Sequence, residues 1–203
     1  MNISLNLNNI KNNVMKYISI IFFTFSLFIF NTSKAQIFTK IEGVNFPSKN
    51  IINNNAVVLN GGGLREKYGF VDLYVGGLYL KSKTNDANKI IMADEEMGIR
   101  IVIVSSLVSR EKFIEALEEG FENTTAGEHT KEQIEKFKKC FTDPFVKNDK
   151  VVLNYVPGEG VHLLMNGTKK GTIQGLPFKQ ALFGIWLGGV PASEDLKSGM
   201  LGL

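Results

Sequence analysis

A short run of β-branched residues near the middle of the chain predicts a strand that is covered on both faces. Residues 99–104 read Ile-Arg-Ile-Val-Ile-Val, so five of these six side chains are isoleucine or valine. Branched side chains of this kind favour strands, and apolar residues on both alternating faces indicate cover on both sides. The run therefore predicts a central strand of a sheet.

Strand-like and helix-like periods alternate on either side of this run. Further strands are expected at residues 37–46, 56–60, 70–80, 150–156, 161–166 and 168–174, and helices at residues 85–92, after Ser109, at 131–141, at 178–187 and after Ser193. Serine is a favoured N-cap, and Asn166-Gly167 is a strong two-residue hairpin signal. This order of strands, helices, strands and helices predicts one α+β domain, with a large antiparallel sheet backed by a layer of helices.

Residues 1–35 have the composition of a cleavable export signal. Two lysines precede an apolar run of 14 residues, Tyr17 to Phe30, and Ser33-Lys34-Ala35 fits the small-x-small cleavage pattern. The alternative is an uncleaved membrane anchor, but this run is short for a ~30 Å hydrocarbon core. We therefore expect cleavage to leave residues 36–203 as a periplasmic or secreted domain without a permanent membrane span.

Removal of this segment changes the charge of the protein. The whole chain has 23 Lys and Arg against 20 Asp and Glu, and residues 1–35 contain three lysines and no acid. Residues 36–203 therefore carry no formal net charge. The basic isoelectric point of the full chain belongs largely to the signal, so we expect no nucleic-acid partner.

The cysteine and histidine content indicates no disulfide, metal or cofactor. Cys140 is the single cysteine, so it cannot form an internal disulfide, and its helical neighbourhood indicates a small core residue. His129 and His162 lie on different expected elements, without the spacing of metal ligands.

Arg65 is the candidate binding residue that the chain itself offers. It follows three glycines, Gly61–Gly63, which would let another group approach the backbone closely. If Gly69-Phe70 is a two-residue hairpin loop, Arg65 lies directly opposite Tyr74, and a guanidinium with a phenol suits a carboxylate. If the loop is Tyr68-Gly69 instead, Arg65 faces Asp72 in an ordinary surface ion pair.

Three stretches, taken in order, resemble the chalcone isomerase-like family, and with the elements between them the resemblance covers nearly all of residues 37–203. They are residues 61–67 with 71–80, residues 109–113 after a strong strand, and residues 181–188 with 190–193. The resemblance implies an open-faced β-sandwich with a ligand cleft between the sheet and the helices. The family includes plant enzymes that close a flavanone ring and plastid relatives that bind fatty acids.

The resemblance also implies which residues would touch a ligand. Arg65 matches an arginine that meets an anionic ligand oxygen in both branches, and Tyr74 matches a tyrosine of the fatty-acid-binding branch, where the enzymes have threonine. Lys112 matches a lysine near the start of the central helix. At three other enzyme positions this chain has Ser109 for tyrosine, Ala116 for asparagine and Ile185 for serine or threonine.

These departures make the leading hypothesis a non-catalytic protein that binds a fatty acid or similar apolar carboxylate through Arg65, Tyr74 and Lys112. The alternatives are an isomerase or intramolecular lyase of the chalcone isomerase type, and a structural or partner-binding envelope protein without a ligand. No catalytic residue is assigned.

Overall fold

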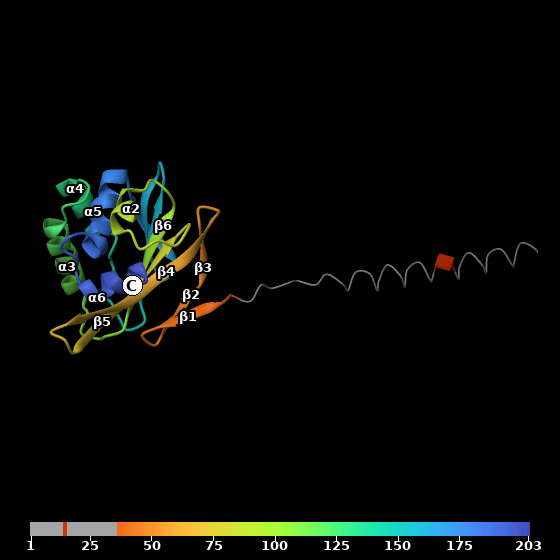
Figure 1. Cartoon of the computed structure of the whole chain (residues 1–203), viewed down its shortest axis with the longest axis horizontal. Helices are drawn as coiled ribbons and strands as arrows, with labels where there is room; N and C mark the ends of the chain where they lie inside the picture. Colours follow the sequence, from red (N-terminus) through yellow and green to blue (C-terminus); the bar gives the residue numbers. More distant parts are fainter. Residues whose placement is uncertain (1–13, 16–35) are drawn as a thin grey trace, which may run out of the picture. The chain divides into compact units, whose positions relative to one another are not determined.

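The computed structural model describes Val14, Met15 and residues 36–203, and Gln36–Leu203 forms one compact unit (Figure 1). The predicted export signal, apart from Val14 and Met15, lies outside the described residues. Within the described part of the chain, no helix is long and apolar enough to cross a membrane.

Seven antiparallel strands form the main sheet, in the order β3-β4-β5-β6-β7-β8-β9. The β-branched run lies in β6, which pairs with β5 on one side and β7 on the other, so the predicted central position is confirmed. The strands are β3 (Lys49–Ile52), β4 (Asn55–Lys67), β5 (Val71–Leu80), β6 (Met97–Ile103), β7 (Lys150–Val156), β8 (Gly160–Met165) and β9 (Thr168–Ile173).

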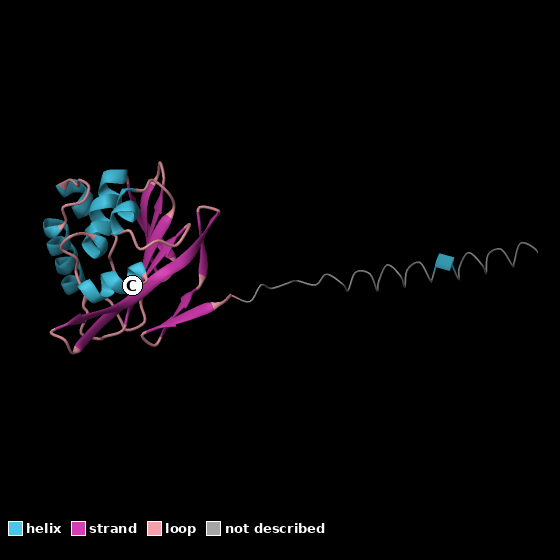
Figure 2. Ribbon diagram, viewed as in Figure 1, coloured by secondary structure: helices cyan, strands magenta, loops and turns pink. Residues whose placement is uncertain are grey.

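Helices cover one face of this sheet (Figure 2). They are α2 (Ala87–Met92), α3 (Arg110–Asn123), α4 (Lys131–Lys138), α5 (Leu176–Leu187) and α6 (Glu194–Leu201). The main hydrophobic core lies between the two layers and is rich in aromatic side chains. This arrangement confirms the predicted α+β class, an open-faced β-sandwich with one large antiparallel sheet and a helical layer.

A small hairpin packs against the other face of the sheet. Residues 37–46 were expected to form one strand, and this prediction is wrong, because β1 (Phe38–Ile41) and β2 (Val44–Pro47) form a separate two-stranded sheet. Glu42 and Gly43 between them both have positive φ, the backbone conformation of a tight hairpin turn. Phe46 of β2 is fully buried in a second, smaller core beneath this hairpin.

The local signals at helix ends are mostly confirmed. Ser109 accepts a hydrogen bond from the Lys112 backbone N–H at 3.2 Å, and Ser193 caps α6 in the same way. Helix α4 ends at Lys138 rather than at the expected residue 141. The backbone N–H groups of Cys140 and Phe141 bond three residues back, which tightens the last turn, and Cys140 is buried as predicted.

The three-glycine segment lets helix α6 lie directly on strand β4. A Cβ atom on Gly61 would overlap the carbonyl oxygen of Gly199, and one on Gly199 would lie 2.6 Å from the carbonyl oxygen of Gly62. The predicted close approach at Gly61–Gly63 therefore occurs, and the approaching group is the backbone of α6. This contact fixes α6 beside the strand that carries Arg65.

Lys179 is a fully buried cation that ties helix α5 to helix α2. Its Nζ donates to the carbonyl oxygens of Ile90, Ile91 and Ala93 at 2.9, 2.8 and 2.7 Å. These carbonyls stand at the C-terminal end of α2, where helices leave acceptors without partners and favour a cation. Burial lowers the pKa of Lys179 to about 8, and Asp94 and Glu95 oppose the shift.

The stability of the fold is expected to rise with pH between about 8 and 10.4, because the pKa of Lys179 is lower in the folded than in the unfolded chain. In that window the unfolded state binds more protons. From pH 7 to pH 9 the wild type should gain about 1 kcal/mol in free energy of unfolding relative to Lys179→Met, which has no ammonium to lose. Urea unfolding at both pH values measures the difference. Both proteins contain the same tyrosines and cysteine, so the titration of these groups cancels in the difference between their free energies of unfolding. If that difference stayed constant or fell from pH 7 to pH 9, the expectation would be contradicted.

Candidate functional site

Arg65 and Tyr74 lie directly opposite each other on strands β4 and β5. Tyr74 belongs to the core between sheet and helices, and residues paired across an antiparallel ladder point to the same face. Arg65 therefore also points toward the helical layer. It is half-buried, whereas Tyr74 is only 8% exposed.

The loop that joins β4 to β5 differs from both of the two-residue loops predicted from the sequence. The loop has three residues, 68–70, because Lys67 pairs with Val71. A β-bulge then shifts the register, so that Glu66 faces Asp72 while Arg65 faces Tyr74. The extra loop residue and the bulge offset each other, and the predicted partner of Arg65 is reached.

The alternative ion pair with Asp72 is absent. Among the described residues, no carboxylate lies within 4.0 Å of the Arg65 guanidinium. Its Nη1 donates instead to the backbone carbonyl of Glu66 at 2.7 Å. A guanidinium has five N–H donors, so this bond leaves most of them available to another acceptor.

Trp186 of helix α5 completes a buried polar cluster with Tyr74. Its indole Nε1 donates to the Tyr74 hydroxyl oxygen at 3.0 Å, and Trp186 is 1% exposed. Because the hydroxyl accepts from Trp186, its own hydrogen remains free to donate in another direction. The apolar pattern of residues 178–187 predicts burial of this tryptophan and carries no signal for its polar contact.

The environment keeps the Tyr74 phenol protonated. Burial raises its pKa above the ordinary value, and the Trp186 indole and the Arg65 guanidinium oppose that rise. At neutral pH the group is therefore a hydrogen-bond donor rather than a phenolate. A protonated phenol beside a cationic guanidinium can hold an anionic oxygen, and neither group is a base.

Helix α3 borders this cluster through Phe113 rather than through Lys112. The Phe113 ring meets the Tyr74 ring edge-on with centroids 6.3 Å apart. Lys112 precedes it in the first turn of α3, where its side chain is exposed and only its backbone N–H is engaged, with Ser109. The structure thus brings Arg65 and Tyr74 together and leaves Lys112 on the rim of the helical layer.

A cluster of phenylalanines continues from Phe113 into the core. Phe113 packs against Phe141 and Phe145, with ring centroids 5.6 and 5.1 Å apart. All three rings are buried between the sheet and the helices. They form an apolar region next to the polar cluster.

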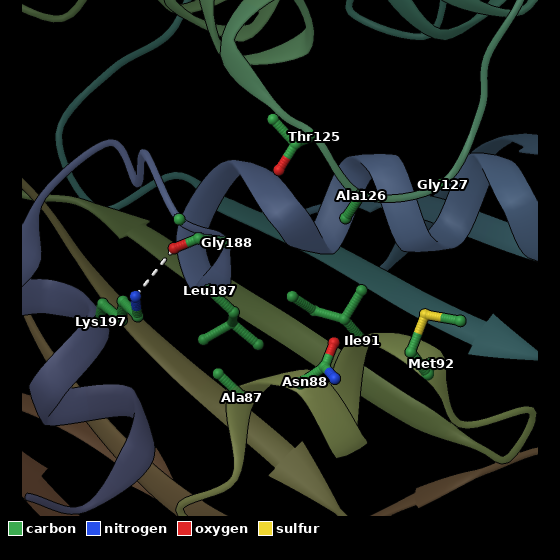
Figure 3. Close-up of a pocket in the computed structure, with 11 residues that line it drawn as sticks. Ala87, Asn88, Ile91, Met92, Thr125, Ala126, Gly127, Leu187, Gly188 and Lys197 are labelled. Carbon is green, nitrogen blue, oxygen red and sulfur yellow. Dashed lines mark hydrogen bonds between the residues drawn. The ribbon is translucent and has the colours of Figure 1, made fainter.

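A pocket lies elsewhere, between helices. It has a volume of about 350 Å³ and opens between α2, the connection from α3 to α4, and the end of α5 (Figure 3). Lys197 stands at one side and donates to the Gly188 carbonyl at 2.8 Å. Arg65, Tyr74 and Lys112 do not line this pocket. Within the described residues, no cluster of three or more His, Cys, Asp or Glu side chains could hold a metal ion.

The fold is an open-faced β-sandwich, and the Arg65 guanidinium and the Tyr74 phenol lie on the face of its sheet that the helices cover. A family model described as chalcone isomerase-like matches residues 38–202. The chain therefore belongs to the chalcone isomerase-like family, and the resemblance stated from its motifs is confirmed.

A solved structure has the same fold. The crystal structure of a fatty-acid binding protein from Arabidopsis thaliana matches with a TM-score of 0.66 and 19% sequence identity, over 81% of this chain and 96% of that chain. At this identity the likeness concerns the fold. A comparison with curated protein sequences finds no match.

Proposed function

We propose that the protein binds a fatty acid or a similar apolar carboxylate without catalysing a reaction on it. The observation that carries the proposal is the pairing of Arg65 with Tyr74 on the helix-covered face of the sheet. The guanidinium supplies a charged, fork-shaped donor for the carboxylate, and the protonated phenol supplies a further hydrogen bond. Lys112, exposed at the start of α3, adds a cation at the rim.

The apolar tail would lie among the phenylalanines that adjoin Tyr74. Phe113, Phe141 and Phe145 pack against one another, so a tail that enters between the sheet and α3 would take the place of their mutual contacts. Apolar walls with a few convergent polar groups are the usual composition of a small-molecule site. The fatty-acid-binding function of the structural relative from Arabidopsis thaliana supports this choice of ligand.

The ring-closing plant enzymes of the family have polar side chains at positions where this chain has other residues, and these differences support binding rather than isomerisation. The Ser109 hydroxyl is engaged as the cap of α3, and Ala116 has no hydrogen-bonding side chain. Arg65 and Lys112 would then have to orient both a substrate and its nucleophile, without the tyrosine that positions a water in the enzyme.

The proposal includes export to the cell envelope through removal of residues 1–35. Native mass spectrometry of protein purified from its own host tests export and binding in one measurement. The expected species has the mass of residues 36–203 plus a bound lipid. A species that retains residues 1–35 would refute cleavage of the export signal, and the absence of any copurified lipid would count against the ligand.

Substitution of Arg65 by alanine is expected to weaken fatty-acid binding at least about tenfold. A hydrogen bond to a charged group contributes about 1.5–3 kcal/mol, and every 1.4 kcal/mol is a factor of ten. Titration of a monomeric fatty acid in vesicle-free buffer gives the affinity. The matched control is Lys49→Ala, which removes an exposed cation from β3 and should leave the affinity unchanged. Equal affinities of Arg65→Ala and wild type would reject the proposed site.

A further inference from the structure

The tip of the β4–β5 hairpin presents two large aromatic side chains to solvent. Tyr68 is 76% exposed and Phe70 is 78% exposed, with Gly69 between them. The hairpin extends as a long arm at the lower left of the view in Figure 1, and β4 and β5 are the two longest strands of the sheet. Neither aromatic ring contributes to either hydrophobic core.

Tyr68 also occupies a backbone conformation that its side chain disfavours. Its φ is 59°, in the left-handed region that glycine and asparagine adopt most readily. At most other such positions the same chain uses asparagine, with Asn53-Asn54 in the β3–β4 turn and Asn166 in the β8–β9 turn, and Glu42 is the one other exception among the described non-glycine residues. Tyr68 is the one aromatic residue with positive φ in the described part of the chain. The fold does not need an aromatic side chain there, so its presence points to a role outside the fold.

Two more exposed apolar residues lie at the same end of the sheet. Leu107 follows the end of β6 and Val146 precedes the start of β7, and both are more than half exposed. A backbone hydrogen bond from Val104 to the Leu73 carbonyl joins the segment after β6 to the hairpin, and one from Asn148 to the Ile103 carbonyl joins the segment before β7 to the end of β6. We call this end of the sheet, with Tyr68, Phe70, Leu107 and Val146, the hairpin end.

The hairpin end also carries lysines that have no carboxylate partner. Lys67, Lys112 and Lys147 are exposed on three different segments, and none of them forms an ion pair within 4.0 Å among the described residues. The Nζ of Lys67 stands 5.3 Å from the centre of the Tyr68 ring. The two acids of the hairpin, Glu66 and Asp72, lie opposite each other on β4 and β5. They are one residue further from the tip than Lys67.

We infer that the hairpin end docks onto an anionic lipid bilayer, with Tyr68 and Phe70 inserted at the level of the headgroups. Aromatic rings on a convex tip, with lysines around them, match the interface of such a bilayer. The inference deepens the proposed function and rests on it, because a fatty acid dissolved in a bilayer holds its carboxylate at the headgroups. Arg65 is three residues from Tyr68 along β4, so the docked hairpin end places the guanidinium close to that level.

Co-sedimentation of the purified protein with lipid vesicles, in the absence of fatty acid, tests docking. Vesicles of phosphatidylethanolamine with phosphatidylglycerol should bind the protein more strongly than vesicles of phosphatidylcholine alone, and added salt should weaken the binding. Phe70→Ser and Tyr68→Asn should each lower the vesicle partition coefficient about tenfold or more. Tyr68→Asn should keep or raise the melting temperature, because asparagine accepts the left-handed conformation.

The matched control is Ile51→Thr. Ile51 of β3 is 69% exposed and lies next to the β3–β4 turn, at the opposite end of β4 from the hairpin tip, so its replacement should leave vesicle binding unchanged. Three results would overturn docking: no vesicle binding by the wild type, binding that both tip variants retain, or self-association that the tip variants abolish, which would make a second copy the occupant. The vesicle-free titration with Arg65→Ala examines the ligand site separately, so a failure of docking and a failure of the proposed function are distinguishable.

Discussion

Replacement of Lys179 by methionine is expected to lower the free energy of unfolding by about 2–3 kcal/mol at pH 7. The substitution keeps the length of the side chain, but it leaves the carbonyls of Ile90, Ile91 and Ala93 without the ammonium that they share. The Lys179 side chain is fully buried, so water cannot replace the lost donor without entering the core. Relief of the cost of burying a charge offsets part of the loss, which is why the expected change is not larger.

Urea denaturation of both proteins measures this change, and Lys197→Met is the matched control. Lys197 also donates to a carbonyl at the end of a helix, that of Gly188, but it makes one such bond and is partly exposed. Its replacement should cost less than about 1 kcal/mol. If Lys179→Met were as mild as Lys197→Met, the buried lysine would not hold α2 and α5 together.

Substitution of Gly61 by alanine is expected to cost about 3 kcal/mol in stability, at the upper end of the usual range for overpacking. The added methyl group would meet the backbone of α6 at Gly199, and a backbone atom cannot move aside as a flexible side chain can. The helix would have to shift away from β4, and the buried side chains of Leu196 and Met200 would lose contacts. Thermal or urea unfolding measures the loss.

Gly189→Ala is the control for this substitution. Gly189 is exposed, and a Cβ atom added there would meet no heavy atom within 4 Å. Its replacement should change stability by less than about 0.5 kcal/mol. A Gly61→Ala protein with the stability of Gly189→Ala would mean that α6 does not lie against the three-glycine segment.

The candidate pair was predictable from the sequence, but its geometry was not. One of the two loops predicted around Gly69 placed Arg65 opposite Tyr74, the family resemblance gave both residues a ligand-binding role, and the register confirms the pair. The predicted two-residue loop is wrong, because Tyr68 takes a left-handed conformation that its residue type disfavours, and a bulge at Leu73 restores the alignment. Turn propensities describe each residue type by itself. They therefore do not predict a bulge that corrects the change of register caused by a longer loop.

Two polar contacts of the core had no signal in the sequence. Trp186 and Tyr74 are 112 residues apart in the chain, and Lys179 is 89 residues from Ile90. Both Trp186 and Lys179 lie in α5, a helix so apolar that its pattern indicates burial on all sides without indicating a partner. The neighbours of such a helix are set by how the layers pack.

The sequence by itself determined the α+β class and several local features: the covered central strand, the serine caps of α3 and α6, the Asn166-Gly167 turn and the need for a close approach at Gly61–Gly63. These features depend on side-chain period, backbone conformation and local hydrogen bonds, which act within a few residues. The tertiary structure alone decided that α6 approaches the glycines, that Trp186 meets the Tyr74 hydroxyl and that Lys179 caps α2. Those contacts join distant segments, and they follow from the way the helical layer packs on the sheet.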